Sequence, residues 1–267
     1  TAHWLSLHGL VTVVALLIYV LTAHVFEQRR PPAAAIAWVL FMLLLPYVAL
    51  PAFLLFGSRK LPRPRMASAL VADSADSPLG WAERTALALG QPAPAGYRDL
   101  HVHADGEAAL AALWEVLDGA RHSIDCCTFI LGRDHVGSEV VRRLAEKARA
   151  GLRVRLLLDG VGRLMGSRAD LQPLRDAGAE LSFFVAPLRS PLKGRTNLRN
   201  HRKMLLADAD AVADPRQARL WCGGRNLAAE YFDGMPGHTP WRDLSFDVRG
   251  DIVRQGMALF EHDWAFA

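Results

Sequence analysis

Residues 200–208 read Asn-His-Arg-Lys-Met-Leu-Leu-Ala-Asp, and the rest of the chain can be arranged around them. We expect a short strand here. Because strand side chains alternate between two faces, His201 and Lys203 should share one face. A nucleophilic imidazole beside a fixed positive charge suits a phosphodiester, since the imidazole can attack phosphorus while the ammonium neutralises the phosphoryl oxygens. Taken alone, the pair also fits the solvated face of an edge strand.

A second pattern follows twelve residues after this stretch ends. A short apolar run at 220–222 leads into Gly223-Gly224-Arg225-Asn226. Two glycines after a strand let backbone N–H groups approach an anion closely, and Asn226 adds a side-chain donor. We therefore predict that Gly223 and Gly224 bind phosphate beside His201 and Lys203.

Basic residues crowd the segment just before the first pattern and inside it. They are Arg189, Lys193, Arg195, Arg199 and Arg202. One interpretation is an electrostatic funnel for a phosphate-bearing substrate, with Arg199 and Arg202 nearest the phosphate. The other interpretation is a solvated basic loop.

Composition narrows the possible classes of protein. The chain has 267 residues, 51% of them apolar, and a formal charge of +4. This basic balance fits nucleic acid, anionic lipid or solvent as the partner. The three cysteines, two of them adjacent, give no disulfide framework and indicate a reducing compartment. No Cys or His pattern has zinc spacing, so we expect no metal.

Two long apolar runs open the chain. Residues 4–26 contain no Asp, Glu, Lys or Arg, and residues 33–56 contain no charge at all. At ~1.5 Å per residue the second run reaches about 36 Å, more than the roughly 30 Å hydrocarbon core of a bilayer. A signal peptide followed by a buried core helix is the alternative, but a basic leader and a cleavage site are missing. We expect a two-helix transmembrane hairpin over residues 1–57.

Basic residues also predict the orientation of this hairpin. Four follow the second run (Arg59, Lys60, Arg63 and Arg65), against two in the turn (Arg29 and Arg30). By the positive-inside rule, the part after residue 57 should be cytoplasmic.

The remaining chain divides into a linker and an α/β domain. Residues 58–100 are rich in Pro, Ala, Ser and Gly and read as a linker with a short helix at 81–89. From residue 101, predicted helices (106–119, 137–150, 171–177 and 251–264) interleave with predicted strands (123–131, 153–159, 181–185, the motif strand, 220–222 and 244–248). We therefore expect an α/β domain at 101–267 with a mixed, largely parallel sheet and helices on both faces.

The two patterns together resemble a known family. H-x-K-x4-D followed by G-G-x-N resembles the HKD motif of the phospholipase D superfamily. Residues 197–203 and the step Trp241-Arg242-Asp243 are similar to strings in bacterial cardiolipin synthases, and residues 37–47 resemble their N-terminal membrane module. Two departures stand out. The spacing between Asp208 and Gly223 is longer than usual, which indicates an insertion near residues 214–215. The family uses two HKD motifs per active site, and this chain has one.

The resemblance implies a catalytic role for five residues. His201 would form a phosphohistidine, with Lys203 and Asn226 holding the phosphoryl oxygens. Asp208 is the acid of the motif, and in the family it anchors the strand. Asp243 is the candidate to orient the imidazole, the alternative being a surface salt bridge. No cofactor is implied.

We therefore expect a membrane-bound phosphatidyltransferase that makes cardiolipin from two phosphatidylglycerol molecules. The alternatives are a dimeric phospholipase D-type phosphodiesterase, hydrolysing phospholipid or nucleic acid, and an inactive lipid-binding module. The hairpin favours lipid over nucleic acid and implies a two-pass protein of the bacterial inner membrane. The second motif would come from a missing half of a longer chain or from a homodimer. The apolar end at residues 264–267 favours the missing half.

Overall fold

The computed structural model describes residues 2–25, 32–57, 80–165, 169–185, 198–210 and 216–267. These residues form two compact units, which we describe one at a time. The first unit contains the N-terminal helices. The second is an α/β domain, and it contains His201 and every other residue predicted for the site.

The N-terminal unit holds one helix long and apolar enough to cross a membrane. Helix α1 spans Ala2–Val25, and its candidate membrane segment is Ser6–His24. The second apolar run does not form one continuous helix. It divides into α2 (Pro32–Leu44), α3 (Pro46–Ala52) and a π-helical turn, η1 (Phe53–Gly57). Pro46 has no N–H and its ring disfavours helical backbone at Leu45, so the helix ends there. Among the described residues, the predicted second span is therefore two shorter helices.

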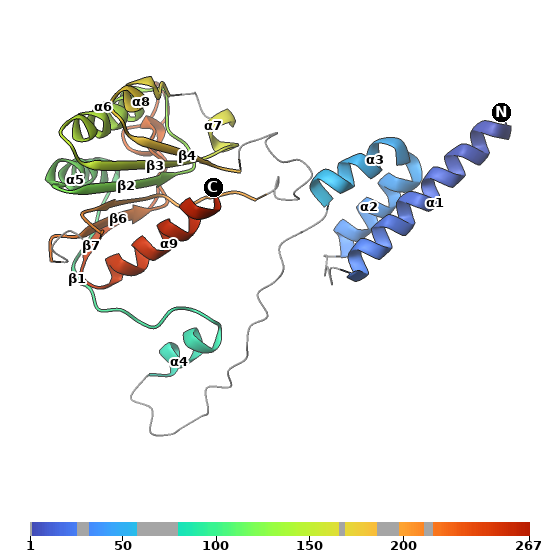
Figure 1. Cartoon of the computed structure of the whole chain (residues 1–267), viewed down its shortest axis with the longest axis horizontal. Coiled ribbons are helices and arrows are strands. Elements are labelled where there is room, and N and C mark those ends of the chain that lie inside the picture. The colour runs from blue at the N-terminus through green and yellow to red at the C-terminus, as the bar shows by residue number, and fades with distance from the viewer. Residues whose placement is uncertain (1, 26–31, 58–79, 166–168, 186–197, 211–215) are drawn as a thin grey trace. The chain divides into compact units, whose positions relative to one another are not determined.

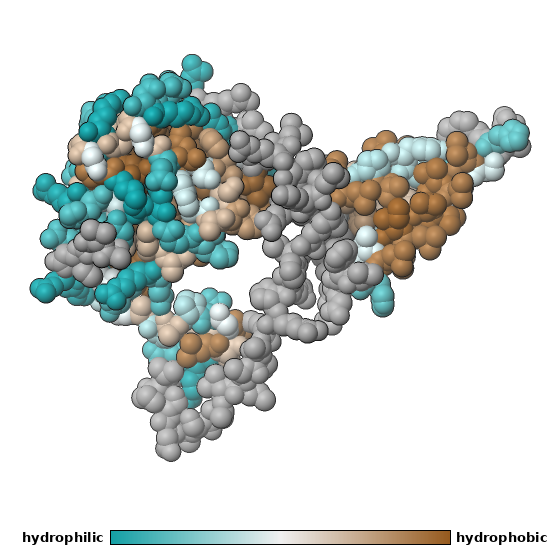
Figure 2. All heavy atoms as spheres, in the orientation of Figure 1, coloured by the Kyte–Doolittle hydropathy of each residue, from teal (hydrophilic) through white to brown (hydrophobic). Residues whose placement is uncertain are grey.

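The N-terminal helices pack through a small apolar and aromatic cluster. Its buried members are Ala15, Tyr19, Met42, Ala49 and Phe53. The ring of Phe53 lies 5.2 Å from that of Tyr19 and 5.3 Å from that of Trp38, centroid to centroid. Many other leucines and valines of these helices face outward, and Figure 2 shows hydrophobic residues gathered over this unit. An apolar exterior of this size suits contact with lipid or another apolar surface.

The α/β domain is built on a seven-stranded sheet with the order β1-β7-β6-β5-β2-β3-β4. The strands are β1 (Arg98–Val102), β2 (Ser123–Thr128), β3 (Arg153–Asp159), β4 (Glu180–Phe184), β5 (Met204–Ala207), β6 (Arg219–Gly223) and β7 (Ser245–Arg249). The sheet is mixed, as predicted, but the prediction that it is largely parallel is wrong. Only β2–β3 and β3–β4 pair in parallel, and the other four pairings are antiparallel. Helices separate β2, β3 and β4 along the chain, whereas the described residues between β5 and β6 and between β6 and β7 contain no α-helix, which permits antiparallel neighbours.

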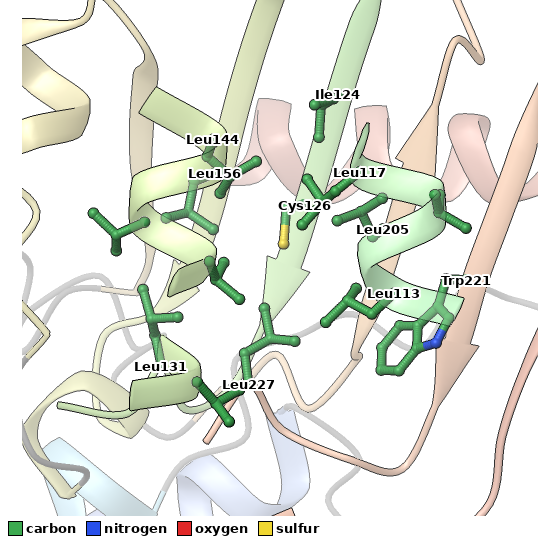
Figure 3. Packing of buried hydrophobic residues seen from close by; sticks show 14 of the residues in the cluster. Leu113, Leu117, Ile124, Cys126, Leu131, Leu144, Leu156, Leu205, Trp221 and Leu227 are labelled. Carbon is green, nitrogen blue, oxygen red and sulfur yellow. The ribbon is translucent and has the colours of Figure 1, made fainter. Parts of the chain in front are cut away.

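Helices cover both faces of the sheet (Figure 1). Neighbouring residues of β6 point to opposite faces, and each meets a different helix. Trp221 donates its indole N–H to the carbonyl oxygen of Ala109 in α5 (Gly106–Gly119), while Leu220 lies beside Gly256 of α9 (Ile252–Phe266). The main core lies between the sheet and the helices α5 and α6 (His135–Arg149), where leucines from both helices and from the strands interdigitate (Figure 3).

The helices and strands begin and end close to the residues expected from the sequence. Helix α5 starts after Asp105, whose carboxylate accepts the N–H of Ala108, and α6 starts after Asp134, which accepts the N–H of Gly137. The smaller elements are α4 (Trp81–Ala88), α7 (Gly162–Met165), α8 (Gln172–Asp176) and a 3-10 turn, η3 (Ala229–Tyr231). The edge strand β1 was not predicted, and all five of its residues are exposed.

Charged contacts hold α9 on its face of the sheet. Arg155 of β3 is nearly buried and donates to the fully buried Asp125 at 2.6 Å and to Glu261 of α9 at 2.6 Å. Its guanidinium also lies over the rings of Phe260 and Trp264, 5.0 and 5.2 Å from their centroids. This anchoring fixes the C-terminal turns of α9, which contact the site described next.

Candidate active site

His201 and Lys203 lie side by side, but they precede the strand rather than belong to it. Strand β5 begins at Met204, so the strand alternation expected for the pair does not apply. The backbone instead brings the Lys203 Nζ back to 2.7 Å from the carbonyl oxygen of His201 and 2.9 Å from its Nδ1. The Phe129 ring lies beside the imidazole, with the ring centroids 4.8 Å apart and the ring planes tilted by 57°. The imidazole and the ammonium are therefore adjacent, as predicted. The backbone before β5 brings them together, and strand alternation does not.

The pKa of both groups is lowered, and burial is the largest cause in each case. For His201, burial lowers the pKa most, the Lys203 ammonium lowers it further, and the carboxylate of Asp159 raises it. For Lys203, which is 3% exposed, burial lowers the pKa while the charge of Asp243 raises it. A histidine with a lowered pKa is neutral at pH 7 and has the lone pair that a nucleophile needs.

Contact with Lys203 also selects a tautomer of His201. A charged ammonium has only N–H donors, so Nδ1 must accept its hydrogen bond. In the neutral ring the proton then sits on Nε2. Attack on phosphorus through Nε2 requires this proton to move to Nδ1, and that in turn requires the ammonium to leave Nδ1.

The predicted use of Gly223 and Gly224 as anion donors is wrong. The N–H of Gly223 donates to the carbonyl oxygen of Lys203 at 3.3 Å, and the N–H of Gly224 donates to that of Leu244 at 3.0 Å. Both backbone N–H groups are therefore already engaged in hydrogen bonds to neighbouring backbone. The glycines serve close packing instead, since a Cβ on Gly223 would collide with Leu244 O, and one on Gly224 with the carboxylate of Asp243.

Asn226 is almost fully buried behind the site, at 3% exposure. Its side-chain oxygen accepts the N–H of Ile130 at 3.1 Å, and a hydrogen bond between Asn226 and the Tyr231 hydroxyl opposes the rise that burial causes in the pKa of Tyr231. These contacts tie the segment after β2 to the segment after β6. Direct donation to a phosphate by Asn226 stays a prediction.

The charge of Asp243 acts on Lys203 rather than on the His201 imidazole. Its carboxylate accepts the N–H of Leu244 at 2.7 Å and lies against Gly224, and its charge raises the pKa of Lys203 and of Arg225. Among the described residues, the carboxylate whose charge acts on His201 is Asp159. The predicted orientation of the imidazole by Asp243 stays a prediction.

Asp208 lies at the other end of β5 from Lys203. Its carboxylate accepts backbone N–H groups from Arg121, His122 and Ser123 at distances of 2.6–3.1 Å, just before β2. The side chain is 3% exposed. A carboxylate in this position joins β5 to the start of β2, at the end of the strand that is away from His201.

The two arginines predicted to bind phosphate lie in the loop that leads into β5. Arg202 is ion-paired with the buried Asp263 of α9 at 2.6 Å, so its guanidinium is already engaged inside the protein. Arg199 starts the same loop. The other three basic residues predicted for this region, Arg189, Lys193 and Arg195, lie outside the described residues.

Three residues not predicted for the site hold this loop. Asn200 donates its backbone N–H to Asp159 at 2.8 Å and its side-chain N–H to Asp263 at 2.8 Å. Its side-chain oxygen accepts the N–H of Arg202 at 3.0 Å. The Asp-Gly step that ends β3 was visible in the sequence, but its contact with Asn200 spans 41 residues. Within the described segments, no three His, Cys, Asp or Glu side chains are grouped so that they could hold a metal ion.

Comparisons with known proteins find a family and several relatives with similar sequences. A family model described as "Cardiolipin synthase, PLD-like domain" matches residues 113–264, which is more than half of the chain. A model described as "Phospholipase_D-nuclease N-terminal" matches residues 11–58. The chain is 29% identical over 282 residues to cardiolipin synthase A of Pseudomonas entomophila, covering 97% of this chain and 56% of that protein. It is 31% identical over 258 residues to the cardiolipin synthase of Geobacillus kaustophilus, covering 90% and 50%.

Two solved structures align with part of the chain. NucT from Helicobacter pylori aligns with a TM-score of 0.45 and 13% identity over 64% of this chain and 97% of that one. Nuc of Salmonella typhimurium, a phospholipase D family member, aligns with a TM-score of 0.44 and 13% identity over 62% and 94%. The chain spans about half the length of the curated relatives it matches. With the family model covering most of the α/β domain, the chain belongs to the phospholipase D-like family of cardiolipin synthases.

Proposed function

We propose that this chain contributes the first catalytic half of a membrane-bound phosphatidyltransferase that makes cardiolipin and glycerol from two phosphatidylglycerol molecules. The observation that carries the proposal is the contact between His201 and Lys203 at 2.9 Å, with the imidazole pKa lowered and Phe129 beside its ring. The names of the relatives, all cardiolipin synthases, support the substrate class.

The first step is attack of the His201 ring on the phosphodiester. A bond forms between an imidazole nitrogen and phosphorus, and the bond from phosphorus to the leaving glycerol oxygen breaks. The buried Lys203 ammonium neutralises charge on the phosphoryl oxygens. A phosphoryl oxygen that attracts Lys203 would release Nδ1, which could then carry the ring proton and leave Nε2 free to attack. Binding of the substrate and activation of the nucleophile are thereby coupled.

The second step transfers the phosphatidyl group to an alcohol. The hydroxyl of a second phosphatidylglycerol attacks phosphorus, the bond to the imidazole breaks, and the neutral ring returns. The leaving alkoxide of the first step needs a proton, and the attacking hydroxyl of the second must lose one. We assign both transfers to a second HKD histidine, supplied by a further half of the chain or by another copy.

The membrane association is also part of this proposal. Helix α1 holds a candidate span at Ser6–His24, and α2 and α3 present further apolar surface. We propose an N-terminal anchor at residues 1–57, a linker at 58–100 and a catalytic domain at 101–267 on the cytoplasmic side of the bacterial inner membrane. Such an anchor would keep the active site beside substrates that never leave the bilayer.

The test is product analysis with the native-length protein in phosphatidylglycerol vesicles. The His201→Ala variant should form no cardiolipin, whereas His135→Ala, which removes an exposed histidine paired with Asp233, should match the parent protein. Undiminished cardiolipin in His201→Ala would overturn the proposal. Added glycerol separates transfer from hydrolysis, because it should drive a transferase backwards from cardiolipin to phosphatidylglycerol and leave a hydrolase unaffected.

A further inference from the structure

The carboxylate of Asp159 is buried at the end of β3 and directed into the loop of the HKD motif. The residue is 1% exposed. One carboxylate oxygen accepts the N–H groups of Val161 and Gly162 at 2.8 and 2.9 Å, and the other accepts the N–H of Asn200 at 2.8 Å. Among the described residues, its hydrogen-bond partners are these three backbone amides.

The Asp159 carboxylate is one of two carboxylates that hold Asn200, the residue before His201. The second is that of Asp263 in α9, which accepts the Asn200 side-chain N–H at 2.8 Å. The remaining polar atom of the Asn200 side chain accepts the N–H of Arg202 at 3.0 Å. Backbone and side chain of Asn200 are thus both fixed, and the position of the His201 backbone follows from them.

The two carboxylates around the motif act on different groups. The charge of Asp159 acts on His201, whereas that of Asp243 acts on Lys203 and Arg225. A neutral imidazole that bonds to phosphorus becomes a positively charged phosphoimidazolium. A buried negative charge favours that positive form more strongly than a charge in water could, because the local dielectric response is weaker.

We propose that Asp159 is a positioning residue for His201: its carboxylate fixes the motif loop through Asn200 and supplies the negative charge that offsets the charge gained by the imidazole in the first chemical step. This inference rests on the proposed function for that step. The placement of the carboxylate beside the motif loop stands without it.

The test compares two isosteric variants of the native-length protein, Asp159→Asn and Asp134→Asn. Asp134 is the matched control, because its carboxylate also joins two segments by accepting backbone N–H groups, from Gly137 at 2.9 Å and Ala229 at 3.0 Å, and its charge is not among those that act on His201. Two readouts are taken for each variant: the titration of the His201 ring by NMR, and kcat and KM for cardiolipin formation against pH.

Asp159→Asn should move the titration of His201 and the acid limb of kcat to lower pH, and should lower kcat about tenfold with KM within about twofold. Asp134→Asn should move neither, even where its melting temperature falls as much. An unchanged His201 titration in Asp159→Asn, with losses matched by Asp134→Asn, would reduce Asp159 to a structural residue and overturn the proposal. A shifted titration in a protein that makes no cardiolipin under any condition would support the placement of the charge and reject the proposed function instead.

Discussion

The Nζ of Lys203 lies 2.9 Å from Nδ1 of His201 and 2.7 Å from the carbonyl oxygen of the same residue. The two side chains of the motif are therefore partners before any substrate arrives. Lys203 depresses the pKa of the ring it contacts, and burial depresses the pKa of both.

Replacing this lysine tests both of its effects at once. Lys203→Met keeps the length of the side chain and removes the charge, so we expect kcat to fall roughly 10²–10³-fold, as for other lost donors to a developing oxyanion. The NMR titration of His201 should move to higher pH, because one cause of its lowered pKa is gone. The control is Lys147→Met, which removes a lysine bonded to carbonyl oxygens of Asp118 and Ala120 outside the site. An unchanged His201 titration in Lys203→Met would contradict the contact.

The lowered pKa of His201 also predicts the pH dependence of the parent protein. Only the neutral ring can attack, and a pKa below the ordinary value of about 6.5 keeps the ring neutral to lower pH. The acid limb of kcat/KM should therefore fall below pH ~6.5. A profile of the rate between about pH 5 and 8 checks this, and a limb above the ordinary histidine range would show that a carboxylate dominates the ring instead.

Gly223 should not tolerate a side chain. A Cβ at this position would collide with the backbone carbonyl oxygen of Leu244 and with Cα of Ser245, so Gly223→Ala should displace the start of β7 and cost about 1–3 kcal/mol in the free energy of unfolding. The matched control is Gly119→Ala in α5, where an added Cβ meets nothing within 4 Å and alanine favours the helix. Urea unfolding of both variants measures the difference, and equal stability would show that the loop before β7 adjusts freely.

Asp208 should matter for stability rather than for the chemical step. Asp208→Ala leaves the N–H groups of Arg121, His122 and Ser123 without their acceptor, and alanine is strained at the φ of 53° found here, so we expect a loss of roughly 2–4 kcal/mol. Asp105→Ala, which removes only a helix cap, should cost about 1 kcal/mol. At a temperature where the Asp208 variant is folded, its kcat should stay within a few fold of the parent. A loss of kcat as large as that of Lys203→Met would place Asp208 in the chemistry after all.

Local patterns in the sequence predicted the elements of the fold well, because they depend on residues close in the chain. The bounds of α5 and β3 match the expected ranges, and the apolar run at 220–222 lies in β6. The direction of pairing was harder to predict, since it depends on which strands are joined by helices. The expectation for Gly223 and Gly224 failed for a related reason. A sequence shows that glycine permits a close approach, but the partner that approaches is set by the register of β6 with β7.

The site itself was only half visible in the sequence. His201 and Lys203 could be found from their spacing, because they are two residues apart in the chain. The carboxylates of Asp159 and Asp263 could not, since they reach Asn200 across 41 and 63 residues and carry no motif of their own.

The contact between Asp263 and Asn200 makes the motif loop depend on the docking of α9. Asp263 accepts the Asn200 side-chain N–H across 63 residues and is also ion-paired with Arg202, whereas the core under α5 and α6 contains no residue of α9. A variant in which α9 leaves its face of the sheet should therefore loosen the loop that carries His201 and keep that core assembled. The seating of α9 thereby links catalytic competence to the completion of the domain.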